Sequence, residues 1–215
     1  MKRILILGAA LLAAAPAANA GDHYPYTDEN CGVTTVYEQA PERAVTLSNN
    51  ATEMLLALGL EDRMAGTSYM ANLKISPQYE EAYNSVPVLS PLVATTEQLI
   101  DAEADFVYAG YPDGFSEKRH TRDQLHDLGM KTRLNTEGCN LGKYGFDELY
   151  AEIRSVAGIF GVPERGEALV GKARRCRHLA DRPVLRFQHR PCPVDARAHL
   201  PAVRRQTGGQ LERVA

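Results

Sequence analysis

The sequence lacks the short motifs that mark common nucleotide-binding and hydrolase sites. It has no Gly-x-Gly-x-x-Gly, no phosphate-binding loop ending in Lys-Ser/Thr, and no Gly-x-Ser-x-Gly turn around a nucleophilic serine. Ser48 and Ser68 have no partner base that the sequence reveals. We therefore expect no catalytic residue and no enzyme, and a small secreted α/β hydrolase stays only as an alternative.

Patterns of metal ligands are missing as well. His120 and His126 are six residues apart and cannot share one helix face as a zinc pair would. Asp101, Glu103 and Asp105 alternate like calcium-loop ligands, but no Gly or closing Glu follows at the required spacing. A direct metal-ion receptor would need His ligands at the strand ends, where the sequence has none. We expect neither a metal site nor a cofactor.

Only one apolar run is long, and it lies at the start of the chain. Ile4 to Ala15 follows Lys2 and Arg3, and Ala18-Asn19-Ala20 forms a small-x-small cleavage site. The run has about twelve residues, fewer than the ~20 of a membrane-spanning helix. We expect residues 1–20 to be a cleavable signal peptide. No Cys stands at the cleavage site for a lipid anchor, so we expect a free periplasmic protein.

The charge divides the chain into two unlike segments. Residues 21–173 contain 12 Lys and Arg against 24 Asp and Glu, whereas residues 174–215 contain 10 Arg, no Lys and 3 acidic residues. The second segment also has scattered prolines and no sustained apolar period. Its composition is typical of a GC-rich gene read out of frame, and we expect a frameshift near residue 174. A basic tail that grips an acidic partner and a metal-binding tail with three His are the alternatives.

Strands and helices alternate between residues 44 and 172, after a short strand pair or lead-in at 31–41. Apolar strands are predicted at 44–47, 65–69, 104–108 and 131–134, with an extended stretch at 86–89. Helices are predicted at about 52–60, 96–102, 116–128 and 146–160, and one begins at Glu164; residues 77–83 are a short helix or an irregular stretch. Thr52 or Asn50 is the expected cap of the first helix, and Thr95 that of the helix at 96–102. This alternation predicts a parallel-sheet α/β lobe.

Eight short pieces of the sequence occur in an order that is similar to a known family. They are Pro41-Glu42-Arg43, Val45-Thr46-Leu47-Ser48, Ala51-Thr52-Glu53, Ala57-Leu58-Gly59, Gly66-Thr67-Ser68-Tyr69, Val86-Pro87-Val88, Glu97-Gln98-Leu99-Ile100 and Ala104-Asp105-Phe106-Val107. From about Cys31 to Arg174 the chain resembles the periplasmic binding proteins of ABC importers for ferric siderophores, haem and cobalamin. The resemblance covers roughly the first half of such a protein.

The resemblance implies a bilobed binder whose two α/β lobes are joined by one long helix and hold the ligand between them. It implies an N-terminal ligand-binding lobe at 21–163, the start of the interlobe helix at 164–175, and an aberrant basic tail at 176–215 in place of the second lobe. A cleft with one wall buries less ligand surface, so we expect a truncated and impaired protein. No nucleic acid is an expected partner, and the chain is expected to be a monomer.

Ligands of open α/β sheets bind beyond the carboxyl ends of the strands. The candidate ligand-binding residues at these ends are Ser48, Asn49, Asn50, Tyr69, Pro91, Gly110 and Tyr111. The first three offer a hydroxyl, amides and free backbone N–H groups, which suit acidic or carbonyl groups of a chelate. The two Tyr rings suit a large, partly apolar ligand. Helix capping by Ser48, Asn49 or Asn50 and simple surface packing of the rings are the alternatives.

Glu97 is a candidate for docking on the membrane permease. The resemblance places a glutamate in this context opposite arginines of the permease, where charge pairing orients docking. The alternative is a carboxylate that serves the dipole of its own helix. The expected partners are therefore an iron chelate or a cobalamin-like molecule and the ABC permease dimer of the inner membrane, with haem or cobalamin as alternative ligands.

Cys31 and Cys139 are the only cysteines before the basic segment. An oxidising compartment lets them pair, and the bond would close a long loop. We predict a disulfide between them.

Overall fold

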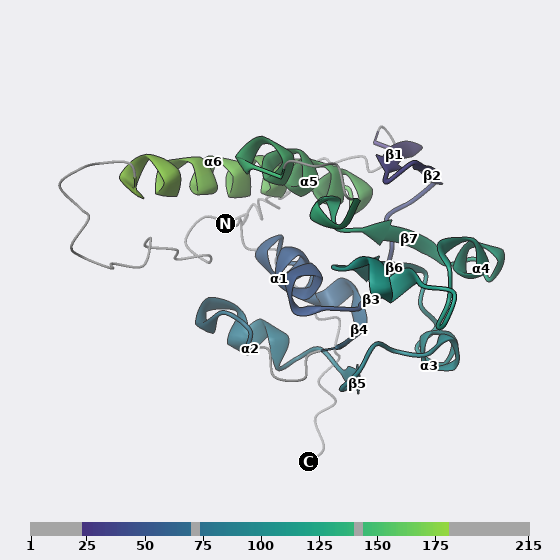
Figure 1. The fold of residues 1–215 in the computed structure, drawn as a ribbon. Coiled ribbons are helices and arrows are strands. Elements are labelled where there is room, and N and C mark those ends of the chain that lie inside the picture. Colours follow the sequence, from purple (N-terminus) through teal and green to yellow (C-terminus); the bar gives the residue numbers. More distant parts are fainter. Residues whose placement is uncertain (1–22, 70–73, 140–143, 181–215) are drawn as a thin grey trace, which may run out of the picture.

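Five parallel strands form the central sheet of the protein (Figure 1). The computed structural model describes residues 23–69, 74–139 and 144–180, so the predicted signal peptide and most of the basic tail lie outside the described residues. The strands are β3 (Ala44–Thr46), β4 (Met64–Ser68), β5 (Val88–Ser90), β6 (Phe106–Ala109) and β7 (Lys131–Leu134), in the order β5-β4-β3-β6-β7. All neighbouring pairs are parallel, which confirms the predicted fold class.

Helices cover both faces of this sheet. Apolar residues of α1 (Asn49–Ala57), α5 (Phe146–Ile159) and α6 (Pro163–Ala180) share one buried cluster, together with the region of the short α2 (Glu80–Tyr83). Leu99 of α3 (Thr96–Asp101) and Leu125 of α4 (Arg122–Asp127) belong to a second cluster. In the described part of the chain, four 3₁₀ turns complete the connections, at Glu61–Arg63, Pro77–Tyr79, Pro112–Phe115 and Thr136–Cys139.

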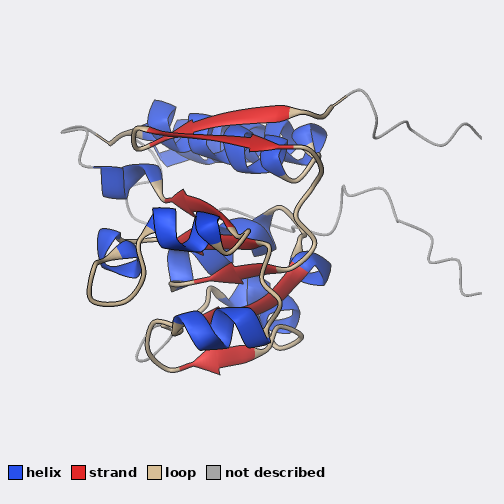
Figure 2. Cartoon of the chain, turned by 90° about the vertical axis from the view of Figure 1, so that its right-hand side faces the viewer, coloured by secondary structure: helices blue, strands red, loops and turns tan. Residues whose placement is uncertain are grey.

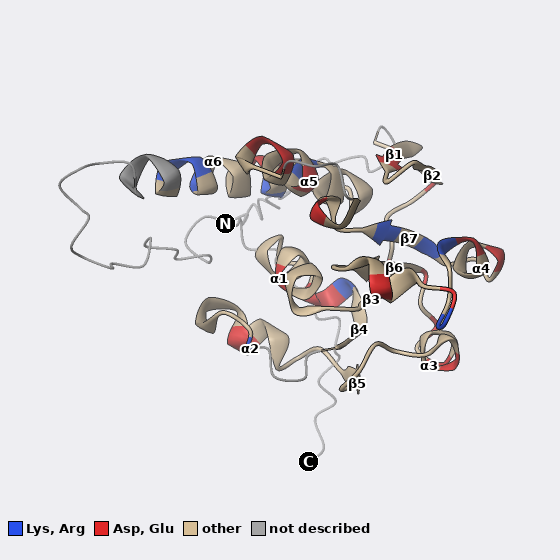
Figure 3. Ribbon diagram, in the orientation of Figure 1, with Lys and Arg blue, Asp and Glu red and all other residues tan. Residues whose placement is uncertain are grey.

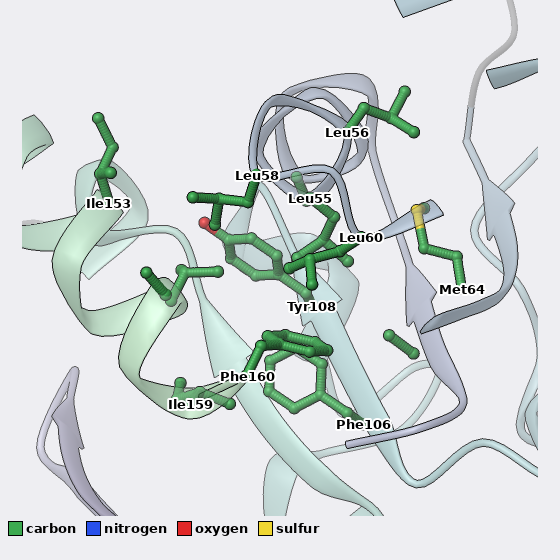
Figure 4. Close-up of a cluster of buried hydrophobic side chains, with 14 of the residues drawn as sticks. Leu55, Leu56, Leu58, Leu60, Met64, Phe106, Tyr108, Ile153, Ile159 and Phe160 are labelled. Carbon is green, nitrogen blue, oxygen red and sulfur yellow. The ribbon is translucent and has the colours of Figure 1, made fainter. Parts of the chain in front are cut away.

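The period of two along each strand explains the two clusters. In β6, Phe106 and Tyr108 belong to the first cluster, whereas Val107 and Ala109 belong to the second. Figure 4 shows the rings of Phe106 and Tyr108 packed among leucines of α1 and the turn after it, with Phe160 beside Phe106. A strand that is apolar on both faces needs helices on both sides, as a parallel sheet provides.

A hairpin of β1 (Tyr26–Asn30) and β2 (Val33–Tyr37) lies beside α5 and α6 at one end of the lobe (Figure 2). The Asn30 side chain closes the free edge of β7, since its Nδ2 donates to the Leu134 carbonyl at 2.9 Å and its Oδ1 accepts from the Leu134 N–H at 2.8 Å. The disulfide between Cys31 and Cys139 is present, as predicted, with Cα atoms 5.0 Å apart. A strand pair is therefore present, but it begins earlier than the predicted range of 31–41, in which only β2 lies.

Two local predictions were wrong. The helix expected at 116–128 spans only Arg122–Asp127, because Pro112–Phe115 forms a 3₁₀ turn and Thr121 starts α4 with a capping box to Gln124. Ser48, rather than Thr52 or Asn50, is the cap of α1. The last helix, expected to begin at Glu164, spans Pro163–Ala180. In contrast, Thr95 caps α3 as predicted.

Within the described ranges, no helix has both the length and the apolar composition needed to cross a membrane.

Candidate functional site

The strand order reverses direction between β3 and β6. From β3 the chain continues through α1 to β4 on one side, and from β6 it continues through α4 to β7 on the other. Their helices pack on opposite faces of the sheet, so the two connections diverge where β3 and β6 end. In open α/β sheets such a switch point is the usual place for a ligand. The candidates Ser48, Asn49, Asn50, Gly110 and Tyr111 all follow these two strands.

Ser48, Asn50 and Gly110 are in direct contact at this point. The buried Ser48 hydroxyl donates to Asn50 Oδ1 at 2.5 Å, and the Ala51 N–H donates to the same oxygen at 3.0 Å. A Cβ on Gly110 would lie 1.9 Å from Asn50 Oδ1 and 2.1 Å from Ser48 Oγ. Only glycine leaves room for this pair beside the end of β6.

The two donors determine how the Asn50 amide is oriented. Because a hydroxyl and a backbone N–H both donate to Oδ1, this atom is the carbonyl oxygen and the NH₂ group faces away from them. Asn50 is half-buried, and its Nδ2 donates to none of the residues that the structure describes. The site therefore presents one amide whose two donor hydrogens are taken by no side chain or carbonyl of the described residues.

Asn49 precedes this amide in the first turn of α1. Its side chain is half-buried, and Oδ1 is fully covered without a hydrogen-bond partner in the described part of the chain. Ser48 is buried as the cap of α1. Its hydroxyl donates to Asn50 Oδ1 and accepts from the Ala51 N–H. Ser48 therefore caps the helix, as the alternative to ligand binding proposed. Asn50 accepts from this cap through Oδ1, and its Nδ2 group points away from it.

Tyr69, Pro91 and Tyr111 follow β4, β5 and β6 at the same edge of the sheet. Tyr69 has a left-handed backbone with φ of 60°, and its N–H donates to the Leu92 carbonyl at 3.0 Å. Its ring is half-buried against the second apolar cluster. Tyr111 is 43% exposed, and Pro91 is exposed. The ring of Tyr111 is therefore more accessible to a ligand than the ring of Tyr69.

Glu97 lies in the first turn of α3 and is exposed. Hydrogen bonds from its own backbone N–H and from the Thr95 hydroxyl lower the pKa of the Glu97 carboxyl, so it stays ionised. It lines a hollow of about 210 Å³ together with Lys118 and Arg119. Figure 3 shows basic residues just before α4, close to the acidic residues of α3.

Lys118 and Arg119 also line a second, open hollow of about 670 Å³ with Asp113, Ser116 and Glu117. Neither hollow includes Ser48, Asn50 or Tyr69. The described ranges contain no group of three or more His, Cys, Asp or Glu side chains arranged to hold a metal ion.

Sequence reasoning missed a set of buried hydroxyls directly under the switch point. Thr46 of β3, Thr52 of α1 and Thr67 of β4 are fully buried, and their hydroxyl oxygens lie 2.7–2.9 Å from one another. The available signal was weak: three threonines at apolar-facing positions, each of which alone is typical of strand packing.

Comparisons with known proteins agree with this fold. A family model described as "Periplasmic binding protein" matches residues 45–179, more than half of the chain. A comparison with curated protein sequences gave no match.

Solved structures are similar over most of the described residues. A periplasmic binding protein from Veillonella parvula is 28% identical, with a TM-score of 0.64 over 72% of this chain and 52% of its own. A structure described as an ABC-type Fe³⁺-hydroxamate transport system from Saccharomonospora viridis is 26% identical, with a TM-score of 0.58 over 71% of this chain and 54% of its own. The molybdate protein MolA of Haemophilus influenzae, 16% identical with a TM-score of 0.57, covers 72% of this chain and 52% of its own and shares the fold. The chain thus spans about half the length of these structures.

Proposed function

Because the chain belongs to the periplasmic binding protein family, we propose that it is the solute-binding component of an ABC importer and binds an iron-siderophore-type chelate in the periplasm. It hands this ligand to a permease dimer in the inner membrane and carries out no chemical step itself. The likeness to a Fe³⁺-hydroxamate transport system at 26% identity supports the choice of ligand class.

The observation that carries the proposal is the outward amide of Asn50 at the switch point. Hydroxamate, catecholate and carboxylate groups present oxygen atoms that accept hydrogen bonds. An amide held with Nδ2 outward by the Ser48 hydroxyl is matched to such an oxygen and not to a donor. The exposed ring of Tyr111 offers an apolar wall for the organic part of the chelate. Ser48, Asn49 and Gly110 shape the turn, and Tyr69 and Pro91 border it.

Glu97 is the proposed contact with the permease. It lies at the same edge of the sheet as the ligand residues, it is exposed, and its lowered pKa keeps it negative. A fixed negative charge of this kind steers and orients docking on a basic surface more than it adds affinity. Exchange of Glu97 for Gln is thus expected to reduce uptake without changing ligand affinity.

The domain organisation remains a proposal of the same kind. Residues 21–163 form the ligand-binding lobe, α6 starts the interlobe helix, and residues 176–215 replace a second lobe after a shift of reading frame near codon 174. The DNA sequence of the gene tests this directly: a shifted frame that does not encode a second α/β lobe would refute it.

An NMR titration tests the ligand class. The full chain is titrated with the gallium(III) complex of desferrioxamine B, a diamagnetic counterpart of a ferric trihydroxamate, and with haem and cyanocobalamin in parallel. We expect saturable binding weaker than micromolar, because one lobe buries only part of the ligand. The Asn50 side-chain amide and the Gly110 N–H should shift, whereas resonances of the β1–β2 hairpin should stay in place.

A pair of matched variants locates the binding. In Asn50→Asp the carboxylate can still accept from Ser48 and Ala51, but its outward atom becomes an acceptor that repels the ligand oxygen. We expect at least tenfold weaker binding, whereas Asn84→Asp, the same change at an exposed position after α2, leaves binding unchanged. Shifts with haem alone would redirect the proposal to haem. No shift at any of these residues with 1 mM of any of the three ligands would overturn it.

A further inference from the structure

Three threonine hydroxyls beneath the switch point form a connected chain of hydrogen bonds. Thr46 Oγ1 donates to Thr67 Oγ1 at 2.9 Å, and Thr52 Oγ1 donates to the Ser48 carbonyl at 2.7 Å. The two remaining contacts, Thr52 to Thr67 at 2.8 Å and Thr46 to Thr52 at 2.7 Å, have no direction of their own. Each hydroxyl has a single proton to donate.

The donor directions order this chain among the described residues. Thr46 is the donor to Thr67 and Thr52 is the donor to the Ser48 carbonyl, so the proton of Thr67 is the one that goes to Thr52. The Thr46–Thr52 contact carries no proton in this order. The chain runs from β3 through β4 to α1 and ends on Ser48. Hydrogen bonds aligned in one direction strengthen one another in a buried, low-dielectric environment.

Ser48 connects this chain to the candidate ligand site. Its carbonyl accepts both the hydroxyl and the N–H of Thr52, the latter at 3.0 Å, so the peptide after Ser48 is held from below. Its hydroxyl donates to Asn50 Oδ1 at 2.5 Å, so the same residue holds the Asn50 amide from the side. Ser48 thus links the Asn50 amide to the three buried hydroxyls.

We infer that Thr46, Thr52 and Thr67 are positioning residues for ligand binding, which hold the Asn50 amide with its two donor hydrogens toward the ligand. The inference rests on the proposed function for its consequence in affinity, but its structural core concerns Asn50 alone. Valine matches threonine in shape and lacks the hydroxyl, so Thr→Val changes break the chain without opening a cavity. A threonine that only packs the core would leave the Asn50 amide unaffected by this change.

The first readout needs no ligand. In the full chain, a held Asn50 amide gives NH₂ resonances shifted away from those of a free Asn side chain, and its ¹⁵N relaxation shows little fast motion. Thr52→Val should move both resonances toward the free positions and increase this motion, and Thr52→Ser, which restores the hydroxyl, should recover the original values. Thr35→Val is the matched control, because Thr35 of β2 is also buried but its Oγ1 has no partner among the described residues. Thr67→Val, one step further along the chain, replaces Thr52→Val if that variant does not fold.

The second readout is affinity for the gallium(III) complex of desferrioxamine B. Thr52→Val should weaken binding about fivefold, the usual effect of one lost neutral hydrogen bond, and Thr52→Ser should restore it. In an Asn50→Ala background the same Thr52→Val change should have no further effect, since the hydroxyls act through Asn50. Thr35→Val should bind like the unchanged protein.

Two results would overturn the inference. One is an Asn50 amide whose resonances are the same in Thr52→Val and Thr67→Val as in the unchanged chain. The other is an affinity loss that is equally large with and without the Asn50 side chain. If the unchanged chain binds none of the ligands, the proposed function fails, and the amide resonances still decide the positioning role.

Discussion

Two buried polar networks lie in this lobe, and they are built from different chemistry. At the hairpin end, the Asp28 carboxylate of β1 accepts from Arg133 of β7 and from Ser155 of α5. At the switch point, Thr46, Thr52 and Thr67 are joined by neutral hydroxyls. The first network links residues more than a hundred positions apart, whereas the second links residues at most 21 positions apart.

The ionic network also holds α5 onto the sheet. Glu152 of α5 is buried and accepts from the Tyr108 hydroxyl of β6 at 2.7 Å and from the Thr136 N–H at 3.1 Å. Burial is the largest single influence and would lower the pKa of the Arg133 guanidinium, but Asp28, Tyr108 and Glu152 together outweigh it and the pKa of Arg133 is raised. Buried charges are costly when they lose a partner, while a lost neutral hydroxyl costs less. We therefore predict that substitutions at the hairpin end mainly lower the free energy of unfolding, and that substitutions at the switch point mainly lower ligand affinity.

Removal of Arg133 should have the largest effect on stability. Arg133 is only 3% exposed, so Arg133→Met leaves the Asp28 carboxylate buried and without its positive partner. We expect a loss of about 3–5 kcal/mol in the free energy of unfolding, measured by urea denaturation. Exchange of Asp28 for Asn in the same chain should recover part of this loss, because the uncompensated charge is then gone.

Arg154→Met is the matched control for that change. Arg154 also pairs with a carboxylate, Glu167 at 2.5 Å, but both side chains are largely exposed. Water screens this pair, so we expect a change below about 1 kcal/mol. If Arg133→Met and Arg154→Met lower the free energy of unfolding equally, the buried hairpin network does not contribute more to stability than an exposed ion pair.

The covalent link at the hairpin end should rank second. The Cys31–Cys139 disulfide closes a loop with a sequence separation of 108, which restricts the unfolded chain. We expect the Cys31→Ala, Cys139→Ala double variant to lose about 2–4 kcal/mol, read from thermal unfolding beside the unchanged protein. An unchanged chelate affinity in the folded double variant would support the view that the hairpin end affects stability but not ligand binding. A loss of affinity as large as that of Asn50→Asp would contradict this view.

Sequence reasoning reached the hairpin's disulfide but not its charges. Cys31 and Cys139 are rare residues in an oxidising compartment, so a pair follows from composition alone. Asp28, Arg133 and Glu152 look like ordinary surface charges in the sequence, and only the tertiary fold buries them together. The same limit applies to the three threonines.

The prediction of strands and helices was correct where the sequence has a long apolar period. It was wrong where a proline or a capping residue ends a helix that a weak period suggests. The helix from Phe146 follows from its apolar period, and the parallel sheet follows from the alternation of elements. The segment after β6 contains Pro112 and a capping box at Thr121, which together outweigh the weak helical period before Arg122. Ser48, Asn50 and Gly110 follow from their place after strands, but their mutual contact depends on the strand order, which the sequence does not show.

Gly110→Ala sharpens the comparison at the switch point. The added methyl would overlap Asn50 Oδ1 and Ser48 Oγ, so either the pair or the end of β6 has to move. We expect about 1–3 kcal/mol lower stability, and chelate binding should weaken at least as much as in Asn50→Ala. The control is Gly171→Ala in α6, where a Cβ meets only Arg175 Nη1 at 3.6 Å. That change should raise stability by about 0.5–1 kcal/mol, and a loss there would show that methyl addition itself is harmful.

The smallest expected effect concerns a buried group that belongs to neither network. His120 lies after β6, with its Nδ1 3.3 Å from Thr96 Oγ1. Burial, and to a smaller extent the nearby Arg119 charge, lowers the pKa of its imidazole, while a hydrogen bond with the Gly114 backbone partly opposes this shift. In the unfolded chain the pKa of His is about 6.5, so below that pH the unfolded state binds more protons than the folded state. Stability should therefore fall as the pH drops from 7 toward 5, by at most about 1.4 kcal/mol per pH unit for one group.

His120→Gln removes this titration and isolates it from that of the carboxylates. The unfolding free energy of the variant should depend less steeply on pH between 7 and 5 than that of the unchanged protein, while chelate affinity at pH 7 stays the same. Parallel pH profiles would mean that His120 is protonated equally in both states. A variant that also loses affinity would tie the 3₁₀ turn after β6 to the Asn50 site, and the separation of a stability region from a binding region would then have to include this turn on the binding side.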